Sequence, residues 1–314
     1  MTREQAADDS GGVYLMSKIQ KALERAKLLR AGRGGGEPLD LGTPVGGGLP
    51  RPGVAEDAPP AVSPAPWDAR TEFDPVTEAA PEGNFFTQTR VVEVPESLLK
   101  QNKVFAIEEG HPINESFKLL RTRILQTLRP NGWNTIQITG FGSGEGKSTL
   151  AANLALSMCK DARQTTLLVD LNFRNPTLDR LFGFEPGCRG LRSYFQEGIP
   201  LREILVSPGI SKMTVLPAGG VIENATELMG SPQMEKLVRE LKQRYPDRIV
   251  IFDTPGLSLY PDSLVFSDYV DTILVVARAG KTSKTAIRNA MELLPRRKIL
   301  GSVFNGVDNR NPGS

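Results

Sequence analysis

The sequence predicts a doubly wound, mostly parallel α/β sheet that follows a long segment without a core of its own. From residue 135 onward, short runs of β-branched and aliphatic residues alternate with segments of helical periodicity. A glycine-rich segment, residues 140–146, joins one of these runs to the next helical pattern. Residues 34–84 are instead dense in Pro, Gly, Ala and acidic side chains. Alternating strands and helices fold with right-handed crossovers onto a parallel sheet, whereas a segment of the second kind cannot bury enough apolar surface to become ordered.

Composition narrows the classes of function. The chain has 314 residues, a hydrophobic fraction of 39% and a formal net charge of +2, so no global field points to nucleic acid as a partner. Its two cysteines and single histidine predict no disulfide framework and no metal cluster of these residues, which fits a reducing cytoplasm. The longest apolar stretches, such as Ile273 to Ala277, are far shorter than the roughly 20 residues that span a bilayer. We therefore expect a cytoplasmic protein whose membrane contact is peripheral or made through a partner.

The first expected element is a short amphipathic helix over residues 14–33. Apolar side chains recur at helical spacing at Leu15, Ile19, Ala22, Leu23, Ala26 and Leu29. The basic polar side suits an anionic membrane surface or an acidic partner helix, and it equally suits a solvated helix docked on its own domain. Translation can start at Met1 or at Met16. These features divide the chain into an N-terminal extension (residues 1–33), a disordered linker rich in Pro, Gly and Ala (residues 34–90) and a folded domain (residues 91–314).

Within the folded domain, helical spacing first predicts a helix over residues 113–128 that ends before Pro130 and Gly132. Strands are then expected at Thr135–Thr139, Thr166–Val169, Met213–Leu216, Arg248–Phe252, Thr272–Val276 and Ile299–Phe304. Helices are expected between most of them, at Lys147–Lys160, Leu201–Leu205, Pro232–Gln243 and Ser283–Leu294. Short aliphatic runs of this kind are typical of parallel strands that are covered on both faces.

The strongest chemical signal is the segment Gly140–Thr149, which reads GFGSGEGKST and connects an expected strand to an expected helix. Its glycines let backbone N–H groups turn inward, and the helix N-terminus favours an anion. Lys147 suits the β- and γ-phosphates of a nucleotide, and Ser148 suits Mg²⁺. The strict phosphate-loop pattern would place its first glycine at Phe141, whereas this chain has a glycine on each side of that position.

Two aspartates extend this signal. Asp170 ends the run LLVD, and Asp253 ends the run IVIFD. A carboxylate at the C-terminal end of a buried strand, beside a phosphate loop, can hold Mg²⁺ directly or through water. The simpler alternative is that each aspartate caps the loop that follows it. We take the two aspartates as a metal-binding pair and therefore expect ATP and Mg²⁺ as cofactors.

Together these motifs resemble the Walker A, Walker A′ and Walker B motifs of bacterial tyrosine kinases of the CpsD/CapB type, which are relatives of the MinD ATPases. The resemblance extends from about Glu115 to Val307 and includes LPAG at residues 216–219, NATEL at residues 224–228 and the last strand. It implies a P-loop NTPase fold of the MinD and bacterial tyrosine kinase type. It also implies a Mg-ATP-dependent protein-tyrosine kinase or ATPase that regulates exopolysaccharide or capsule synthesis and export, with a Wzz-type membrane copolymerase supplied in trans.

The resemblance assigns roles to individual residues. The catalytic residues would be Lys147, Asp170 and Arg174, and the metal-binding residues would be Ser148, Asp170 and Asp253. Nucleotide binding would use Gly142, Ser143, Gly144, Glu145, Gly146, Lys147, Ser148, Thr149 and Asn305, the last as the contact to adenine. A helix beginning at Glu115 and containing Arg121 resembles the family's oligomerisation motif, which implies a possible homo-oligomer.

Three departures limit this transfer. Asn172 stands where the family usually has a second aspartate, and an amide cannot act as a general base. Ser116 and Lys118 replace a glutamate and an arginine of the oligomerisation motif, which weakens the case for a ring held by those charges. The C-terminal residues 306–314 contain no tyrosine, so phosphorylation of a tyrosine-rich tail is excluded.

Three functions are compatible with these residues: a kinase or ATPase, a nucleotide switch of the MinD kind, and a pseudokinase scaffold that binds nucleotide without phosphoryl transfer. The intact Lys147, Ser148, Asp170 and Asp253 argue against the scaffold. Asn172 and the tail without tyrosine keep the switch close behind the kinase. The MinD relatives often carry an additional lysine early in the phosphate loop, and its absence from residues 140–143 weighs against a sandwich dimer of that type.

Overall fold

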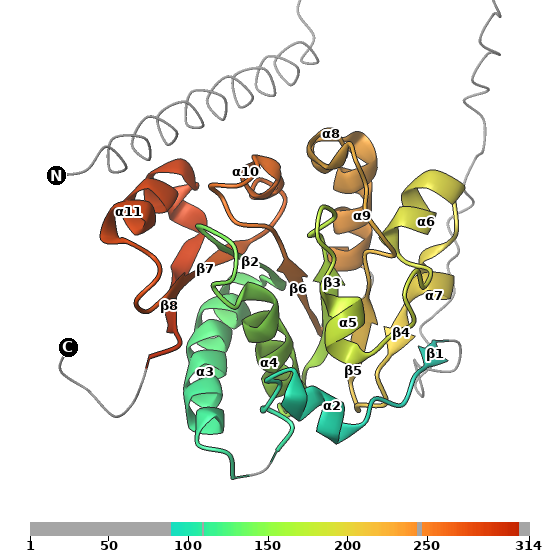
Figure 1. The fold of residues 1–314 in the computed structure, drawn as a ribbon, viewed down its shortest axis with the longest axis horizontal. Helices are drawn as coiled ribbons and strands as arrows, with labels where there is room; N and C mark the ends of the chain where they lie inside the picture. The colour runs from blue at the N-terminus through green and yellow to red at the C-terminus, as the bar shows by residue number, and fades with distance from the viewer. Residues whose placement is uncertain (1–88, 109, 244–246, 308–314) are drawn as a thin grey trace, which may run out of the picture.

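The computed structural model describes residues 89–108, 110–243 and 247–307, and these form a sheet with helices on both faces (Figure 1). The 8-stranded sheet has the order β1-β4-β5-β3-β6-β2-β7-β8. Its strands are β1 (Arg90–Val91), β2 (Thr135–Gly140), β3 (Thr165–Asp170), β4 (Val206–Ser207), β5 (Met213–Leu216), β6 (Arg248–Asp253), β7 (Thr272–Arg278) and β8 (Ile299–Asn305). All neighbouring pairs are parallel except β4 and β5, which are antiparallel. The predicted doubly wound, mostly parallel fold is therefore confirmed. The amphipathic helix expected over residues 14–33 and the expected linker, up to residue 88, lie outside the described residues.

The helices of the described ranges are α2 (Glu96–Gln101), α3 (Ile113–Asn131), α4 (Lys147–Cys159), α5 (Leu178–Phe182), α6 (Leu191–Glu197), α7 (Leu201–Ile204), α8 (Ala225–Met229), α9 (Pro232–Gln243), α10 (Asp262–Phe266) and α11 (Lys284–Leu293). A 3₁₀ turn, Arg296–Lys298, leads into β8. Helices α2 to α5 pack against one face of the sheet and α6 to α11 against the other. None of these helices combines the length and the apolar character that a membrane span requires.

Side chains of the central strands alternate between the two faces. Along β6, Ile249 and Ile251 join the core beneath α3 and α4, while Val250 and Phe252 join the core beneath α9 and α10. Both faces are covered, so every residue of β6 is buried and residues 249–252 form a continuous apolar run. The carboxyl ends of β2, β3 and β6 consequently lie next to one another at one edge of the sheet, where loops can carry polar groups.

Helix α4 crosses the middle of the sheet and is buried along almost its whole length. Asn153 is the main polar side chain within it. Its Oδ1 accepts hydrogen bonds from the backbone N–H groups of Phe105 (2.8 Å) and Ala106 (2.9 Å), and its Nδ2 donates to the carbonyls of Lys103 and Thr149. Asn153 thus ties the segment before α3 to the helix that follows the phosphate loop.

The end predicted for the first helix is wrong. Helix α3 continues through Pro130 to Asn131 and ends on Gly132, which is left-handed with φ 64°. The N–H of Gly132 donates to the carbonyl of Arg129 and the N–H of Trp133 to that of Leu128, the pairing of a Schellman cap. A proline in the last turn removes only one intrahelical donor, and the glycine cap then supplies the actual stop.

Candidate nucleotide and metal site at the carboxyl edge of the sheet

The glycine-rich segment forms a tight loop between β2 and α4, as predicted. Gly144 and Gly146 have φ values of 68° and 88°, in the left-handed region that favours glycine. A side chain at Gly140 would lie only 2.6 Å from the carbonyl oxygen of Val276. The loop therefore requires glycine at 140, 144 and 146, and it delivers Lys147 as the first residue of α4. Phe141, at the position of the strict pattern's first glycine, is accommodated without a left-handed backbone.

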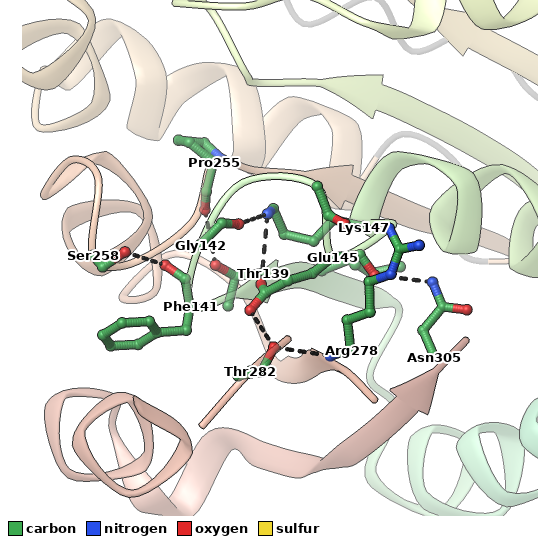
Figure 2. A network of polar contacts seen from close by, with 12 residues as sticks. Thr139, Phe141, Gly142, Glu145, Lys147, Pro255, Ser258, Arg278, Thr282 and Asn305 are labelled. Atoms are coloured by element: carbon green, nitrogen blue, oxygen red, sulfur yellow. Dashed lines mark hydrogen bonds and ion pairs between the residues drawn. The ribbon is translucent and has the colours of Figure 1, made fainter. Parts of the chain in front are cut away.

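Lys147 is buried within this loop, with 8% of its surface exposed. Its ammonium donates to the carbonyl oxygen of Gly142 and lies 3.8 Å from Oε2 of Glu145 (Figure 2). Burial lowers the pKa of Lys147, and the charges of Glu145 and Asp253 oppose that effect. The ammonium of Lys147 is thus already held inside the backbone of the phosphate loop, an arrangement that suits the binding of a polyphosphate.

Asp170 and Asp253 are brought together, also as predicted. They are directly paired in the register of β3 and β6, and both are buried. Asp170 accepts hydrogen bonds from the N–H groups of Asn172, Thr177 and Leu178 at 2.9–3.0 Å. Both oxygens of Asp253 are buried without a hydrogen-bond partner among the described residues. Burial, reinforced by the charge of Asp170, raises the pKa of Asp253 to about 7.

Hydroxyl groups complete this cluster. Oγ1 of Thr177 donates to Oγ of Ser148 at 2.9 Å. Both hydroxyls lie close enough to Asp253 to favour its ionised form, although neither makes a hydrogen bond of ordinary geometry with it. Thr177 is a site residue that the motifs did not single out, because it lies in the loop after β3 rather than within a motif.

The cluster fits Mg²⁺. An unpartnered carboxylate that is fully buried is costly, and a divalent cation bound between Asp253 and Ser148 would compensate its charge. The available donors are oxygens, the ligands that Mg²⁺ prefers. No group of three or more His, Cys, Asp or Glu side chains forms a metal cage within the described ranges. Mg²⁺ takes ligands from substrate phosphates and water, so Asp253, Asp170 and Ser148 are sufficient protein groups.

A second wall of the site comes from β7, β8 and the turn after β7 (Figure 2). Arg278 donates to the carbonyl oxygen of Gly144 at 2.8 Å, and Oγ1 of Thr282 donates to Oε1 of Glu145 at 2.7 Å. Nδ2 of Asn305, expected to contact adenine, donates to the carbonyl oxygen of Glu145 at 2.9 Å. Arg278 and Thr282 are further contacts to the phosphate loop that sequence reasoning missed, because nothing in the sequence brings residue 282 next to residue 145.

Arg174 makes its contacts away from the phosphate loop. Its Nε donates to Oδ2 of Asp262 at 3.1 Å and one terminal nitrogen donates to Oγ1 of Thr226 at 3.0 Å. Its guanidinium carbon lies 4.2 Å from the centre of the Tyr260 ring. The structure thus groups Lys147 with the two aspartates and places Arg174 in a neighbouring polar cluster.

The side chains of the expected oligomerisation helix contact their own chain. Glu115 and Lys118 form an exposed ion pair of 2.7 Å on α3. Arg121 donates to the carbonyl oxygen of Ser157 in α4 at 2.6 Å. Arg121 therefore supports the packing of α3 on α4.

The phosphate loop, its buried lysine and the paired aspartates define a P-loop protein of the kind that binds nucleotides. No family model matches the chain. Tyrosine-protein kinase YwqD of Bacillus subtilis (strain 168) is 31% identical over 209 residues, which cover 66% of this chain and 86% of YwqD. The chain therefore belongs to the bacterial tyrosine kinase family.

Other relatives agree. Tyrosine-protein kinase CpsD of Streptococcus agalactiae serotype III (strain NEM316) is 28% identical over 219 residues, covering 69% of this chain and 89% of CpsD. Among solved structures, the crystal structure of the chimerical protein CapA2B2 matches with a TM-score of 0.59. The two sequences are 28% identical, and the match covers 68% of this chain and 92% of that one. The kinase domain of Escherichia coli tyrosine kinase ETK, at 24% identity and a TM-score of 0.62 over 72% of this chain and 92% of that one, shares the fold. The family inferred from the motifs is confirmed.

Proposed function

We propose that this chain is a Mg-ATP-dependent protein-tyrosine kinase that regulates polysaccharide synthesis or export. The observation that carries the proposal is the buried carboxylate of Asp253, whose oxygens lack partners and which lies beside Ser148, Asp170 and the cation of Lys147. A phosphate loop alone binds nucleotide, whereas this arrangement also provides a place for the cation that phosphoryl transfer requires.

Each residue has a distinct role in the proposed reaction. Lys147 and the N-terminus of α4 hold the β- and γ-phosphates, and the backbone of residues 142–149 encloses them. Ser148, Asp170 and Asp253 hold Mg²⁺, which neutralises charge on the phosphates when bound. Asp170, oriented by three backbone donors, also keeps the loop of residues 172–178 against the site.

Groups from β7 and β8 set the shape of the proposed pocket. Nδ2 of Asn305 holds the backbone of the loop at Glu145, and in this proposal Asn305 also contacts the adenine. Thr282 donates to the Glu145 carboxylate, whose other oxygen lies 3.8 Å from the ammonium of Lys147. Both contacts restrain the loop before nucleotide arrives, and preorganisation of this kind favours transition-state stabilisation.

We infer the biological setting from the resemblance to the CpsD/CapB type of kinase, whose members among the relatives are tyrosine-protein kinase CpsD and the putative tyrosine-protein kinase CapB of Staphylococcus aureus. We infer a cytoplasmic chain that works with a Wzz-type membrane copolymerase supplied in trans, and peripheral membrane contact through residues 14–33. In this proposal the kinase domain begins with β1 at Arg90, one residue before the boundary expected from the sequence, while residues 34–89 form a linker and residues 1–33 the contact segment. A homo-oligomer would use the face of α3 around Glu115, since Arg121 is already bonded to α4.

One alternative has a specific observation behind it. Asn172 replaces a second carboxylate beside Asp170, which favours a nucleotide switch with slow hydrolysis over a rapid kinase. The two functions differ in where the γ-phosphate goes.

The test follows the γ-phosphate of labelled ATP. Purified protein with Mg²⁺ is incubated with a tyrosine-containing copolymer, with and without the cytosolic segment of a candidate copolymerase. We expect transfer of label to tyrosine, and none with Lys147→Ala. Release of free phosphate without labelled tyrosine would favour the switch, and neither product would favour an inert nucleotide-binding scaffold.

A further inference from the structure

Tyr260 is the most accessible tyrosine in the described part of the chain. It lies in the loop between β6 and α10 and is 38% exposed. Tyr194 and Tyr269, by contrast, are packed against the core of the α6 to α11 face. Tyr14 and Tyr245 lie outside the described residues. No protein group in the described ranges hydrogen-bonds the phenolic hydroxyl of Tyr260, so the hydroxyl is available as a nucleophile.

The loop that carries Tyr260 is attached to the phosphate loop. The N–H of Leu257 donates to the carbonyl oxygen of Gly140 at 2.8 Å. The N–H and Oγ of Ser258 both donate to the carbonyl oxygen of Phe141, at 2.8 and 2.7 Å (Figure 2). A side chain at Gly256 would lie 2.7 Å from two carbonyl oxygens of the phosphate loop. Tyr260 is therefore two residues along the chain from Ser258, whose N–H and Oγ contact the phosphate loop directly.

Arg174 links Tyr260 to the loop that follows Asp170. The guanidinium covers the tyrosine ring while it pairs with Asp262, whose side chain is 1% exposed. Arg174 lies in the loop after β3, Tyr260 lies in the loop after β6, and Asp262 is the first residue of α10. The guanidinium of Arg174 thus joins the segments that follow Asp170 and Asp253, the aspartates of the proposed metal site.

We propose that Tyr260 is an acceptor of the phosphoryl group that this kinase transfers. In this step the phenolic oxygen forms a bond to the γ-phosphorus of ATP, the bond from that phosphorus to the bridging oxygen breaks, ADP leaves, and the phenolic proton passes to solvent. The proposal rests on the proposed kinase function and supplies an acceptor within the chain, where the C-terminal residues offer none.

A phosphate at Tyr260 would change the local electrostatics. It adds a charge of about −1.5 to −2 near neutral pH, with oxygens that match the fork of an arginine. Arg174 would then be shared between the phosphate and the buried carboxylate of Asp262. Phosphorylation would therefore act on the ion pair that joins the segments after β3 and β6.

The experiment uses the full chain with labelled ATP and Mg²⁺, followed by mass-spectrometric location of the phosphate and a parallel assay on a tyrosine copolymer. We expect phosphate on Tyr260, loss of most of the self-incorporated label with Tyr260→Phe, and no such loss with the control Tyr269→Phe. Phenylalanine keeps the ring beneath Arg174, so Tyr260→Phe should fold and phosphorylate the copolymer like the parent chain.

The failures are distinguishable. A chain that phosphorylates the copolymer but carries no phosphate on Tyr260 would overturn this inference and leave the proposed function standing. Equal self-incorporation by the parent chain and Tyr260→Phe would overturn it as well. A chain that labels neither itself nor the copolymer would overturn the kinase function and this inference together.

Discussion

Asp170 and Asp253 occupy directly paired positions of β3 and β6, but the protein holds their carboxylates in opposite ways. Three backbone N–H groups donate to Asp170, whereas no group in the described ranges hydrogen-bonds either oxygen of Asp253. Asp170 therefore shapes the loop that follows it, and Asp253 is free to bind a ligand. This asymmetry makes Asp253 the residue on which the proposed chemistry most depends.

The stability of the metal-free protein should depend on pH through Asp253. Its pKa is raised from 3.8 to about 7 in the folded chain, so the folded state binds one more proton than the unfolded state between these values. The free energy of unfolding should then fall as pH rises from about 4 to about 7, by a few kcal/mol, since one pKa unit is worth about 1.4 kcal/mol. Urea unfolding of the parent chain and Asp253→Asn at several pH values measures this contribution together with any change in Asp170, whose pKa is also raised by burial. A difference between the two proteins that stays constant across the window would contradict the account.

The parts of the fold and of the candidate site that could be predicted from the sequence are those that depend on residues close together in the chain. The phosphate loop, β2 and α4 follow from contiguous residues, and the ends of the strands at Asp170 and Asp253 follow from short apolar runs. The antiparallel pairing of β4 with β5 could not be predicted in this way. Strand β4 has only two residues, Val206–Ser207, which are too few to show an alternation of apolar and polar side chains. The roles of Thr177 and Thr282 depend on contacts between distant segments, and a lone threonine carries no local signal of such a contact.

The hydrogen bond from Thr282 to Glu145 leads to a second prediction. Thr282→Val keeps the shape of the side chain but removes the donor to Oε1 of a buried carboxylate whose Oε2 already lacks a hydrogen bond. We expect a loss of stability of about 1–3 kcal/mol, typical of a buried acceptor left unpaired, together with weaker ATP binding. Thr285→Val, at an exposed position of α11, is the matched control. Equal stabilities and equal ATP affinities of the two variants would show that this hydrogen bond is dispensable.

Asn172 decides between the kinase and the switch. If the missing carboxylate limits phosphoryl transfer, Asn172→Asp should raise turnover by about tenfold at most, since dissociative transfer needs little help from a base. ATP affinity should change little, because Lys147 and the backbone cradle provide most of it. Single-turnover loss of the γ-phosphate measures the effect, with Asn175→Asp, at an exposed position of the same loop, as the control. Equal rates for the parent chain and Asn172→Asp would show that the loop tolerates either residue.

The proposed nucleotide and metal site is tested most directly by calorimetry of ATP binding with and without Mg²⁺. The proteins to compare are the parent chain, Lys147→Ala and Asp253→Asn. Lys147→Ala should lose ATP binding under both conditions without unfolding, because the ammonium is a dedicated phosphate contact. Asp253→Asn should keep the affinity for ATP alone and lose the gain that Mg²⁺ brings to the parent chain, because the amide removes the anionic ligand of the cation. An equal gain from Mg²⁺ in the parent chain and in Asp253→Asn would contradict the assignment of this buried pair as the metal site.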